Sequence, residues 1–246
     1  PTVVVEHEQH LMARQLDAAG GALLRSDIEQ LGLTVKTGCA VRSIDGAGRV
    51  ERITLSSGET IDCDTVIICT GIRANTTLAS QAGLAIGRGI TVDDRMRTSD
   101  PDIYAVGECA EHNETIYGLV APGLEQAAVA AANIAGEATD YRGSVPTTKL
   151  KVVGSDVFSM GDIEQLDQRI DLRSVAWRAA DGAAYRRLAV RRWRLAGALG
   201  VGDWPEVNII QQAVRDRALV LPWHSRRFAR TGRLYPQRKP TSVTQW

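Results

Sequence analysis

A carboxylate follows a glycine at the end of a short apolar segment. The segment is Ile103-Tyr104-Ala105-Val106, and Gly107 and Glu108 come directly after it. We expect a buried parallel strand here, which would place Glu108 where open α/β sheets bind ligands, beyond the carboxyl ends of their strands. Gly107 would let the backbone approach a ligand closely. Glu108 could accept hydrogen bonds from sugar or polyol hydroxyls.

The residues after the next loop predict a helix that starts at the same place. Pro122 suits a first helical turn, and an alanine-rich run continues to Gly136. The free amides and the positive dipole end of this helix would point back towards Glu108. The alternative is a buried strand and helix that bind no ligand.

A second carboxylate, Glu6, ends the apolar segment that starts at Thr2. In a dinucleotide-binding fold, a glycine-rich loop follows the first strand, and an acid about 20 residues later binds the ribose. No glycine loop follows Glu6, so we expect this segment to be the second strand, with its glycine loop before Pro1. Glu6 would favour NAD over NADP because a carboxylate repels a 2′-phosphate. A strand that simply ends in a solvated glutamate is the alternative.

Hydrophobic periodicity predicts the elements that position these groups. The front half should contain a helix at 11–31, a strand at 33–36, a β-meander at 41–44, 50–55 and 60–61, a buried strand at 64–69 that closes on Gly71, and short elements at 79–84 and 90–93. After Gly143 we expect strands at 149–153, 157–159, 174–178, 185–191 and 194–199, with turns at Gly182 and Gly197, and a helix at 205–218 whose inward residues include Ile209.

The pattern Thr-x-x-Pro-x-Ile-Tyr-Ala-x-Gly-acid from Thr98 to Glu108 resembles the second flavin motif of the two-dinucleotide-fold FAD/NAD(P)H oxidoreductases. The usual acid of that motif is aspartate. The resemblance implies that Glu108 binds the ribityl chain of FAD and that the following helix starts at the flavin ring. It also implies that Gly71 lies close to a dinucleotide. The cofactor-binding residues it implies are Glu6, Gly71, Gly107, Glu108, Leu119, Val120, Ala121 and Pro122.

Two stretches are most similar to the NAD(P)H-dependent nitrite reductase branch of this family: 107–123, with Gly-Glu-Cys-Ala-Glu-His and Tyr-Gly-Leu-Val-Ala-Pro-Gly, and 146–162. That branch implies hydride transfer from NAD(P)H to FAD, then single electrons to an iron–sulfur centre and sirohaem, which reduce nitrite to ammonia. Flavin reduction by a nicotinamide needs no catalytic acid, base or nucleophile. The implied partners are a small subunit or an iron–sulfur module, and a homo-oligomer is possible. The alternatives are a ferredoxin or rubredoxin reductase, or a non-catalytic interaction fragment.

The resemblance also implies the fold class, which is α/β. Incomplete Rossmann-like NAD- and FAD-binding folds, with parallel sheets and a β-meander, would precede a smaller α+β domain. The expected domains are the C-terminal part of the NAD-binding domain at 1–71, a second segment of the FAD-binding domain at 72–140, an α+β reductase domain at 146–224 and a linker at 225–246. Neither phosphate-binding glycine loop and no iron–sulfur or sirohaem module lies in this sequence. We therefore expect the polypeptide alone to be inactive and to hold FAD weakly.

Composition is that of an ordinary soluble protein, with 44% hydrophobic and 24% charged residues in 246. No apolar run approaches the roughly 20 residues that span a bilayer, and no signal peptide begins the chain, so we expect a cytoplasmic protein without a membrane partner. The cysteines (Cys39, Cys63, Cys69, Cys109) match no metal or redox spacing, and Cys63 and Cys69 should lie in the core. The four histidines should be ordinary surface or loop residues.

The charges are distributed unevenly. Residues 1–140 contain 10 Lys+Arg and 20 Asp+Glu, and the remainder contains 19 and 9. The arginines of the basic part alternate with apolar residues, as on the wet face of a strand. This favours a docking surface for an acidic partner or a neighbouring domain over a nucleic-acid site.

Overall fold

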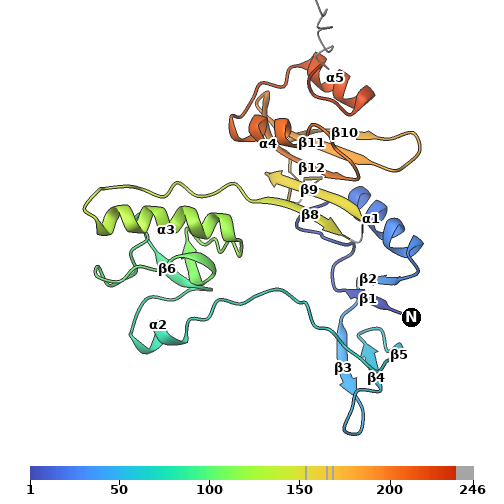
Figure 1. Ribbon diagram of the computed structural model, residues 1–246, viewed down its shortest axis with the longest axis horizontal. Coiled ribbons are helices and arrows are strands. Elements are labelled where there is room, and N and C mark those ends of the chain that lie inside the picture. Colours follow the sequence, from blue (N-terminus) through green and yellow to red (C-terminus); the bar gives the residue numbers. More distant parts are fainter. Residues whose placement is uncertain (153, 165, 168, 237–246) are drawn as a thin grey trace, which may run out of the picture. The chain divides into compact units, whose positions relative to one another are not determined.

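The computed structural model describes residues 1–152, 154–164, 166–167 and 169–236 (Figure 1). The chain forms two compact units. Unit 1 combines residues 1–66 with the chain from Thr147 onward, and unit 2 is Ile67–Pro146. Both units mix helices and strands, in agreement with the predicted α/β class.

The first part of unit 1 contains the predicted strands and meander. Strand β1 (Val3–Glu6) pairs in parallel with β2 (Thr34–Thr37), and helix α1 (Ala18–Gln30) connects them. Strands β3 (Val41–Asp45), β4 (Arg52–Leu55) and β5 (Thr60–Asp62) form an antiparallel sheet. Both the parallel pair and the meander were predicted.

Helix α1 starts seven residues later than predicted. Asp17 is its N-cap, and the Asp17 carboxylate accepts a hydrogen bond from the amide of Gly20. Residues before this cap form turns that fold back on the helix. A Cβ atom at Gly21 would lie 2.8 Å from Nδ1 of His10, so a glycine is needed at this close approach.

The buried strand predicted at 64–69 is absent. Ile67 is 83% exposed and Ile68 69%, and the segment has no regular structure. A parallel strand needs a hydrogen-bonded neighbour, and no strand of the described residues pairs with this one. Cys69 is exposed and Cys63 is partly exposed, so the prediction that they lie in the core is also wrong.

Unit 2 contains helix α2 (Thr77–Gln81), the parallel pair β6 (Ile90–Val92) and β7 (Ala110–His112), the 3-10 turn η1 (Gly107–Cys109) and helix α3 (Val120–Ile134). The strand predicted at 103–106 is wrong. Its backbone bonds locally instead: Thr98 N–H donates to the Ile103 carbonyl and Ala105 N–H to that of Met96. The strand of this region, β7, therefore follows Glu108 rather than preceding it.

The C-terminal part of unit 1 is an antiparallel sheet in the order β10-β11-β12-β9-β8. Its strands are β8 (Thr147–Val152), β9 (Ser155–Gly161), β10 (Arg173–Arg178), β11 (Tyr185–Arg191) and β12 (Arg194–Val201), and helices α4 (Val207–Arg215) and α5 (Pro222–Thr231) follow. Gly182 lies in a turn as predicted. Gly197 lies inside β12, where a Cβ atom would be 2.8 Å from the amide nitrogen of Asp162.

The two faces of this sheet are buried by different helices (Figure 1). Val157, Leu199 and Val201 pack with Leu24 and Ile28 of α1. The opposite face packs against α4 and α5 through a cluster that includes Leu188, Leu195, Ile210 and Phe228. The C-terminal sheet thereby anchors the helix that connects β1 to β2.

The linker predicted from Ser225 is wrong as far as residue 236, and its remainder, 237–246, lies outside the described residues. Phe228 of α5 and Leu234 after it are both 0% exposed. Gly232 ends the helix in the left-handed conformation, with φ +67°. Helix α5 is buried through Phe228 and otherwise carries several arginines, so its low content of apolar residues resembled that of a linker.

Candidate functional site

Gly107 and the first turn of α3 touch each other. Gly107 has φ +82°, a conformation that favours glycine. A Cβ atom at Gly123 would lie only 3.2 Å from Cα of Gly107. The turn η1 and the start of α3, which the sequence predicted to converge, are therefore adjacent.

Glu108 is exposed in η1, next to this contact. In the part of the chain that the structure describes, its carboxylate has neither a hydrogen bond nor an ion pair. It is thus available to a ligand, although it precedes a strand rather than following one.

The first turn of α3 offers uncapped amides. Helix α3 starts at Val120, two residues earlier than predicted, and the side chain of its N-cap residue, Leu119, makes no capping hydrogen bond. The first amides of a helix have no intrahelical acceptor. Val120 is 80% exposed and Ala121 is exposed, whereas Pro122 is buried. The start of α3 can therefore donate hydrogen bonds to a polar group and pack against an apolar one.

Gln126, which was not among the predicted site residues, holds the turn η1 against α3. Its side chain is 1% exposed, and its Oε1 accepts a hydrogen bond from Gly107 N–H at 2.8 Å. The signal for it was a polar residue four positions after Pro122, on the face of α3 that Pro122 shares.

A buried aromatic and histidine cluster lies in the same unit. Burial raises the pKa of Tyr141 to about 12, against the opposing effect of its hydrogen bond to Ser144. Tyr141 stacks edge-on with His112, whose Nε2 lies 2.8 Å from Asp94 Oδ1. His112 is only 4% exposed, so the prediction of a surface or loop histidine is wrong for this residue.

Glu6 lies at the carboxyl end of β1, half-buried, opposite Thr37 of β2. Its Oε1 accepts a hydrogen bond from the amide of Glu8 at 2.9 Å, which fixes the carboxylate at the strand end. Gly71 belongs to unit 2, where it has φ +88° and no neighbouring atom within 4 Å of the position that a Cβ would take. Among the described residues, no contact made by Glu6 or Gly71 identifies a ligand.

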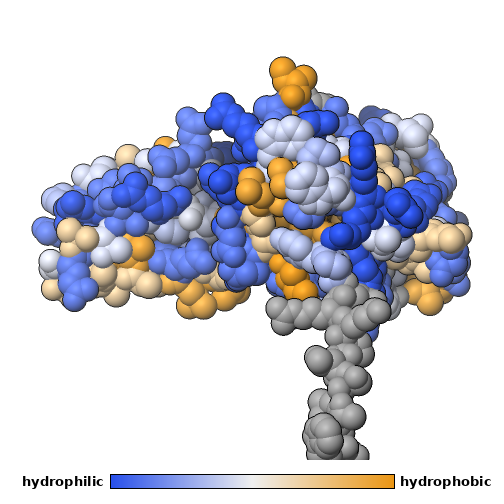
Figure 2. All heavy atoms as spheres, turned by 90° about the horizontal axis from the view of Figure 1, so that it is seen from above, coloured by the Kyte–Doolittle hydropathy of each residue, from blue (hydrophilic) through white to orange (hydrophobic). Residues whose placement is uncertain are grey.

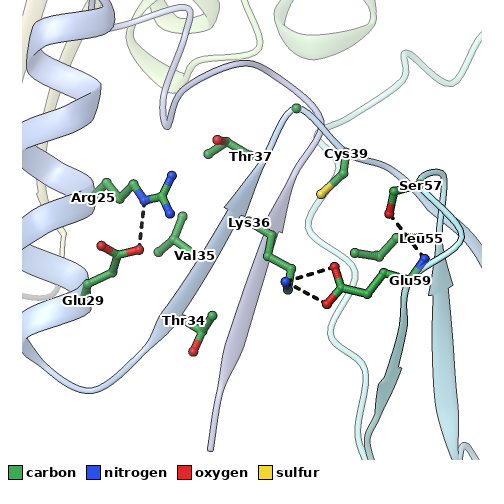
Figure 3. Close-up of a pocket in the computed structure, with 11 residues that line it drawn as sticks. Arg25, Glu29, Thr34, Val35, Lys36, Thr37, Cys39, Leu55, Ser57 and Glu59 are labelled. Atoms are coloured by element: carbon green, nitrogen blue, oxygen red, sulfur yellow. Dashed lines mark hydrogen bonds and ion pairs between the residues drawn. The ribbon is translucent and has the colours of Figure 1, made fainter.

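Unit 1 also contains a cleft of about 520 Å³ between α1, β2 and the meander (Figure 3). None of the predicted site residues lines it. Lys36 Nζ lies 2.8 Å from Glu59 Oε1, and Arg25 Nε lies 2.8 Å from Glu29 Oε1. Because each cation faces its own carboxylate, the cleft offers no unpaired charge to a ligand.

A buried polar cluster joins α1 to the C-terminal sheet, and the sequence analysis missed it. Asp17 accepts hydrogen bonds from Tyr185 Oη and Arg187 Nη1, both at 2.7 Å. Arg187 also contacts Asp167, which lowers the pKa of that carboxyl group. An aspartate just before a helix signals an N-cap, but nothing local predicts partners so far along the chain.

Over the described ranges no group of His, Cys, Asp and Glu could hold a metal ion, and no helix is long and apolar enough to cross a membrane. All four cysteines are free.

Two family models match the chain. The model for pyridine nucleotide-disulphide oxidoreductases matches residues 2–133, and the model for the rubredoxin NAD+ reductase C-terminal domain matches residues 146–218. Together they cover both units.

Similar curated proteins include two nitrite reductases. The chain is 40% identical over 216 residues to nitrite reductase [NAD(P)H] of Bacillus subtilis, covering 87% of this chain and 26% of that protein. It is 37% identical over 238 residues to the nitrite reductase (NADH) large subunit of Escherichia coli, covering 91% and 28%. Rubredoxin-NAD(+) reductase of Pseudomonas putida is 35% identical over 143 residues, covering 55% and 37%. The chain therefore spans only about a quarter of the length of the nitrite reductases it matches.

Solved structures share the fold. The NAD-dependent persulfide reductase from A. fulgidus superposes with a TM-score of 0.79 at 28% identity, covering 88% of this chain and 44% of that one. An FAD-dependent pyridine nucleotide-disulphide oxidoreductase from Desulfovibrio vulgaris gives a TM-score of 0.75 at 28% identity, covering 89% and 58%.

Proposed function

Because the chain belongs to the pyridine nucleotide-disulphide oxidoreductase family, we propose that it is part of a flavoprotein that passes electrons from NAD(P)H through FAD to an iron–sulfur and sirohaem centre, where nitrite is reduced to ammonia. The two nitrite reductase relatives support this reading. The structural observation that carries it is the contact between Gly107 and Gly123, which brings Glu108 to the open start of α3. The two later centres would belong to other modules.

The residues at this contact fit a flavin. Glu108 would accept hydrogen bonds from the ribityl hydroxyls, and the amides of Val120 and Ala121 would donate to the polar edge of the flavin ring. Leu119 and Pro122 would shape the start of the helix at the ring. Glu6 of unit 1 would accept hydrogen bonds from the ribose of NAD(P)H, and Gly71 of unit 2 would let the chain pass close to a dinucleotide.

Flavin supplies the redox chemistry when bound, since it accepts a hydride and releases single electrons. The residues of this chain bind and orient it, and none needs to act as acid or base. We accordingly propose no catalytic residue.

The C-terminal part of the chain is a candidate docking surface for an acidic partner, such as a small subunit or an iron–sulfur module. Exposed arginines without a carboxylate partner among the described residues include Arg192, Arg194, Arg215, Arg217, Arg226 and Arg230. Trp193 and Trp223, 47% and 59% exposed, lie in the same segments. Figure 2 views this side of the molecule and shows hydrophilic and more apolar side chains interspersed. Arginine with an exposed aromatic residue is a common composition of protein interfaces.

A rubredoxin reductase is the second candidate, favoured by the match of residues 146–218. The electron acceptor separates the two. At the same NADH concentration, a nitrite reductase component would reduce the iron–sulfur module of its own system, whereas a rubredoxin reductase would reduce rubredoxin.

Flavin titration tests the proposal. We expect the chain, when extended by the residues encoded upstream, to bind FAD stoichiometrically and to lose flavin absorbance when NADH is added under anaerobic conditions. The 246-residue polypeptide should bind FAD weakly because it has neither glycine loop. An extended chain that binds no FAD would refute the proposed function and favour an interaction fragment. A yellow 246-residue polypeptide with one flavin per chain would contradict the expected weak binding.

A further inference from the structure

The side-chain amide of Gln126 is buried directly behind the turn that carries Glu108. Gln126 lies in α3, is 1% exposed, and accepts the amide proton of Gly107 at 2.8 Å. This bond fixes which end of the buried amide faces Gly107, because only the carbonyl oxygen of the amide can accept the proton.

The hydrogen bond to Gln126 satisfies the Gly107 amide, which has no partner in a helix or a strand. Gly107 starts η1 with φ +82°, and its N–H points to α3 rather than to a neighbouring strand. Without an acceptor, this partly buried amide would be left unsatisfied, which destabilises the turn. The turn therefore depends on Gln126 to hold its present position.

Gly123 provides a second link at the same point. Its lack of a side chain allows Cα of Gly107 to lie against the first turn of α3. One hydrogen bond and one close contact thus hold η1 on the helix. Since Glu108 follows Gly107 directly, these links fix where its carboxylate lies relative to the amides of Val120 and Ala121.

We propose that Gln126 is a positioning residue for the candidate flavin site. It sets the distance between the Glu108 carboxylate and the start of α3, without touching the ligand itself. This inference rests on the proposed function, because it assigns Gln126 a role in holding FAD.

Asn133 provides a matched control for a purely structural role. It is a buried amide on the same helix, 8% exposed, and its Nδ2 donates to the carbonyls of Val129 and Thr139 at 2.9 and 2.7 Å. These bonds secure the far end of α3. Loss of Asn133 should destabilise unit 2 without moving Glu108.

The first experiment uses the 246-residue chain and no flavin. We expect Gln126→Met, which keeps the length of the side chain but removes the acceptor, to increase the hydrogen-exchange rate of the Gly107 amide. Gln126→Glu retains an acceptor and should keep the protection. Asn133→Leu should leave the Gly107 amide protected. Equal exchange at Gly107 in the wild type and in Gln126→Met would overturn the inference.

The second experiment uses the chain extended upstream and measures the Kd for FAD and the flavin reduction potential. Gln126→Met should raise the Kd about tenfold or more, the equivalent of one lost buried hydrogen bond, and should shift the potential. Gln126→Glu should restore the affinity, and Asn133→Leu should change neither value. If Gln126→Met does not fold, Gly123→Ala serves as the second variant. Its added methyl group disturbs the close contact between Gly123 and Gly107 and should raise the Kd for FAD in the same way.

The outcomes separate the two proposals. An extended wild-type chain that binds no FAD refutes the proposed function. A wild type that binds FAD, together with equal losses of affinity in Gln126→Met and Asn133→Leu, leaves the proposed function intact and overturns the positioning role.

Discussion

The Tyr185 hydroxyl donates a hydrogen bond to the Asp17 carboxylate at 2.7 Å, and the two residues are 168 positions apart in the sequence. Asp17 also caps α1 and binds Arg187, so one carboxylate, 8% exposed, joins the start of a helix to the C-terminal sheet. A buried carboxylate with three donors is fully compensated, and its loss leaves each donor without a partner.

Asp17→Ala should therefore lower the free energy of unfolding of unit 1 by about 2–4 kcal/mol, because it uncaps α1 and leaves Tyr185 and part of Arg187 unsatisfied. Tyr185→Phe should cost about 1 kcal/mol, since Asp17 keeps its other partners. Urea unfolding followed by circular dichroism measures both. Glu29→Ala, which breaks the exposed pair with Arg25, is the control and should cost less than about 0.5 kcal/mol. A loss in Asp17→Ala no larger than this control would contradict the assignment.

The raised pKa of Tyr141 predicts a pH dependence at the alkaline end. Its pKa of about 12 exceeds the ordinary value of 10.0 because the phenol is buried. The unfolded chain ionises first, so the contribution of Tyr141 to stability is complete below pH 10 and is lost as the pH rises from 10 to 12. The absorbance of tyrosinate at 295 nm, as the difference between wild type and Tyr141→Phe, should show a midpoint near 12 in the folded protein. A midpoint near 10 would show that the ring is solvated.

Local patterns predicted the elements whose partners are near in sequence. The alternation in β3, β4 and β5 and the short apolar β1 were sufficient, because hairpins and a βαβ connection determine their neighbours. The apolar run at Ile67 and Ile68 was misassigned because β-propensity does not say whether a partner strand exists, and none of the described strands pairs with it. Ile209 was predicted to face inward, but it is 53% exposed, since Ile210 and Val214 already fill that face of α4.

The candidate site was predictable in part. Gly107, Glu108 and Pro122 are carried by a motif, so the sequence indicated that they converge. The contact between Gly107 and Gly123 agrees with that expectation. The burial of Gln126, its hydrogen bond to Gly107 and the partners of Asp17 could not be predicted, because they depend on how separate segments pack.

Phe228 tests the assignment of α5 to the folded core. Its side chain is 0% exposed in the cluster with Leu188, Leu195 and Ile210. Phe228→Ala should cost about 3–5 kcal/mol through lost transfer energy and a residual cavity. Arg230→Ala, an exposed change on the same helix, should stay within about 0.5 kcal/mol of the wild type. Thermal unfolding of the two variants measures the difference. Equal stabilities would show that this segment is a linker, as its sequence predicted, and not part of the folded core.

Glu6 should determine the choice between NADH and NADPH. Its carboxylate is fixed at the end of β1 by the amide of Glu8, where it would accept hydrogen bonds from ribose hydroxyls and repel a 2′-phosphate. Glu6→Ala removes both effects, so NADH should bind more weakly while NADPH loses a repulsion. At contact distance in a hydrated site this repulsion amounts to about 1–2 kcal/mol, so the ratio of the two Kd values should change about tenfold or more in favour of NADPH.

Fluorescence titration of the upstream-extended chain with each nucleotide gives this ratio. Glu8→Ala is the matched control, because the amide of Glu8 that holds Glu6 remains and only an exposed carboxylate is removed. We expect the ratio in Glu8→Ala to stay near that of the wild type. If both variants shifted the ratio equally, the preference would come from the general negative charge of the strand end, and Glu6 would have no specific contact with the ribose.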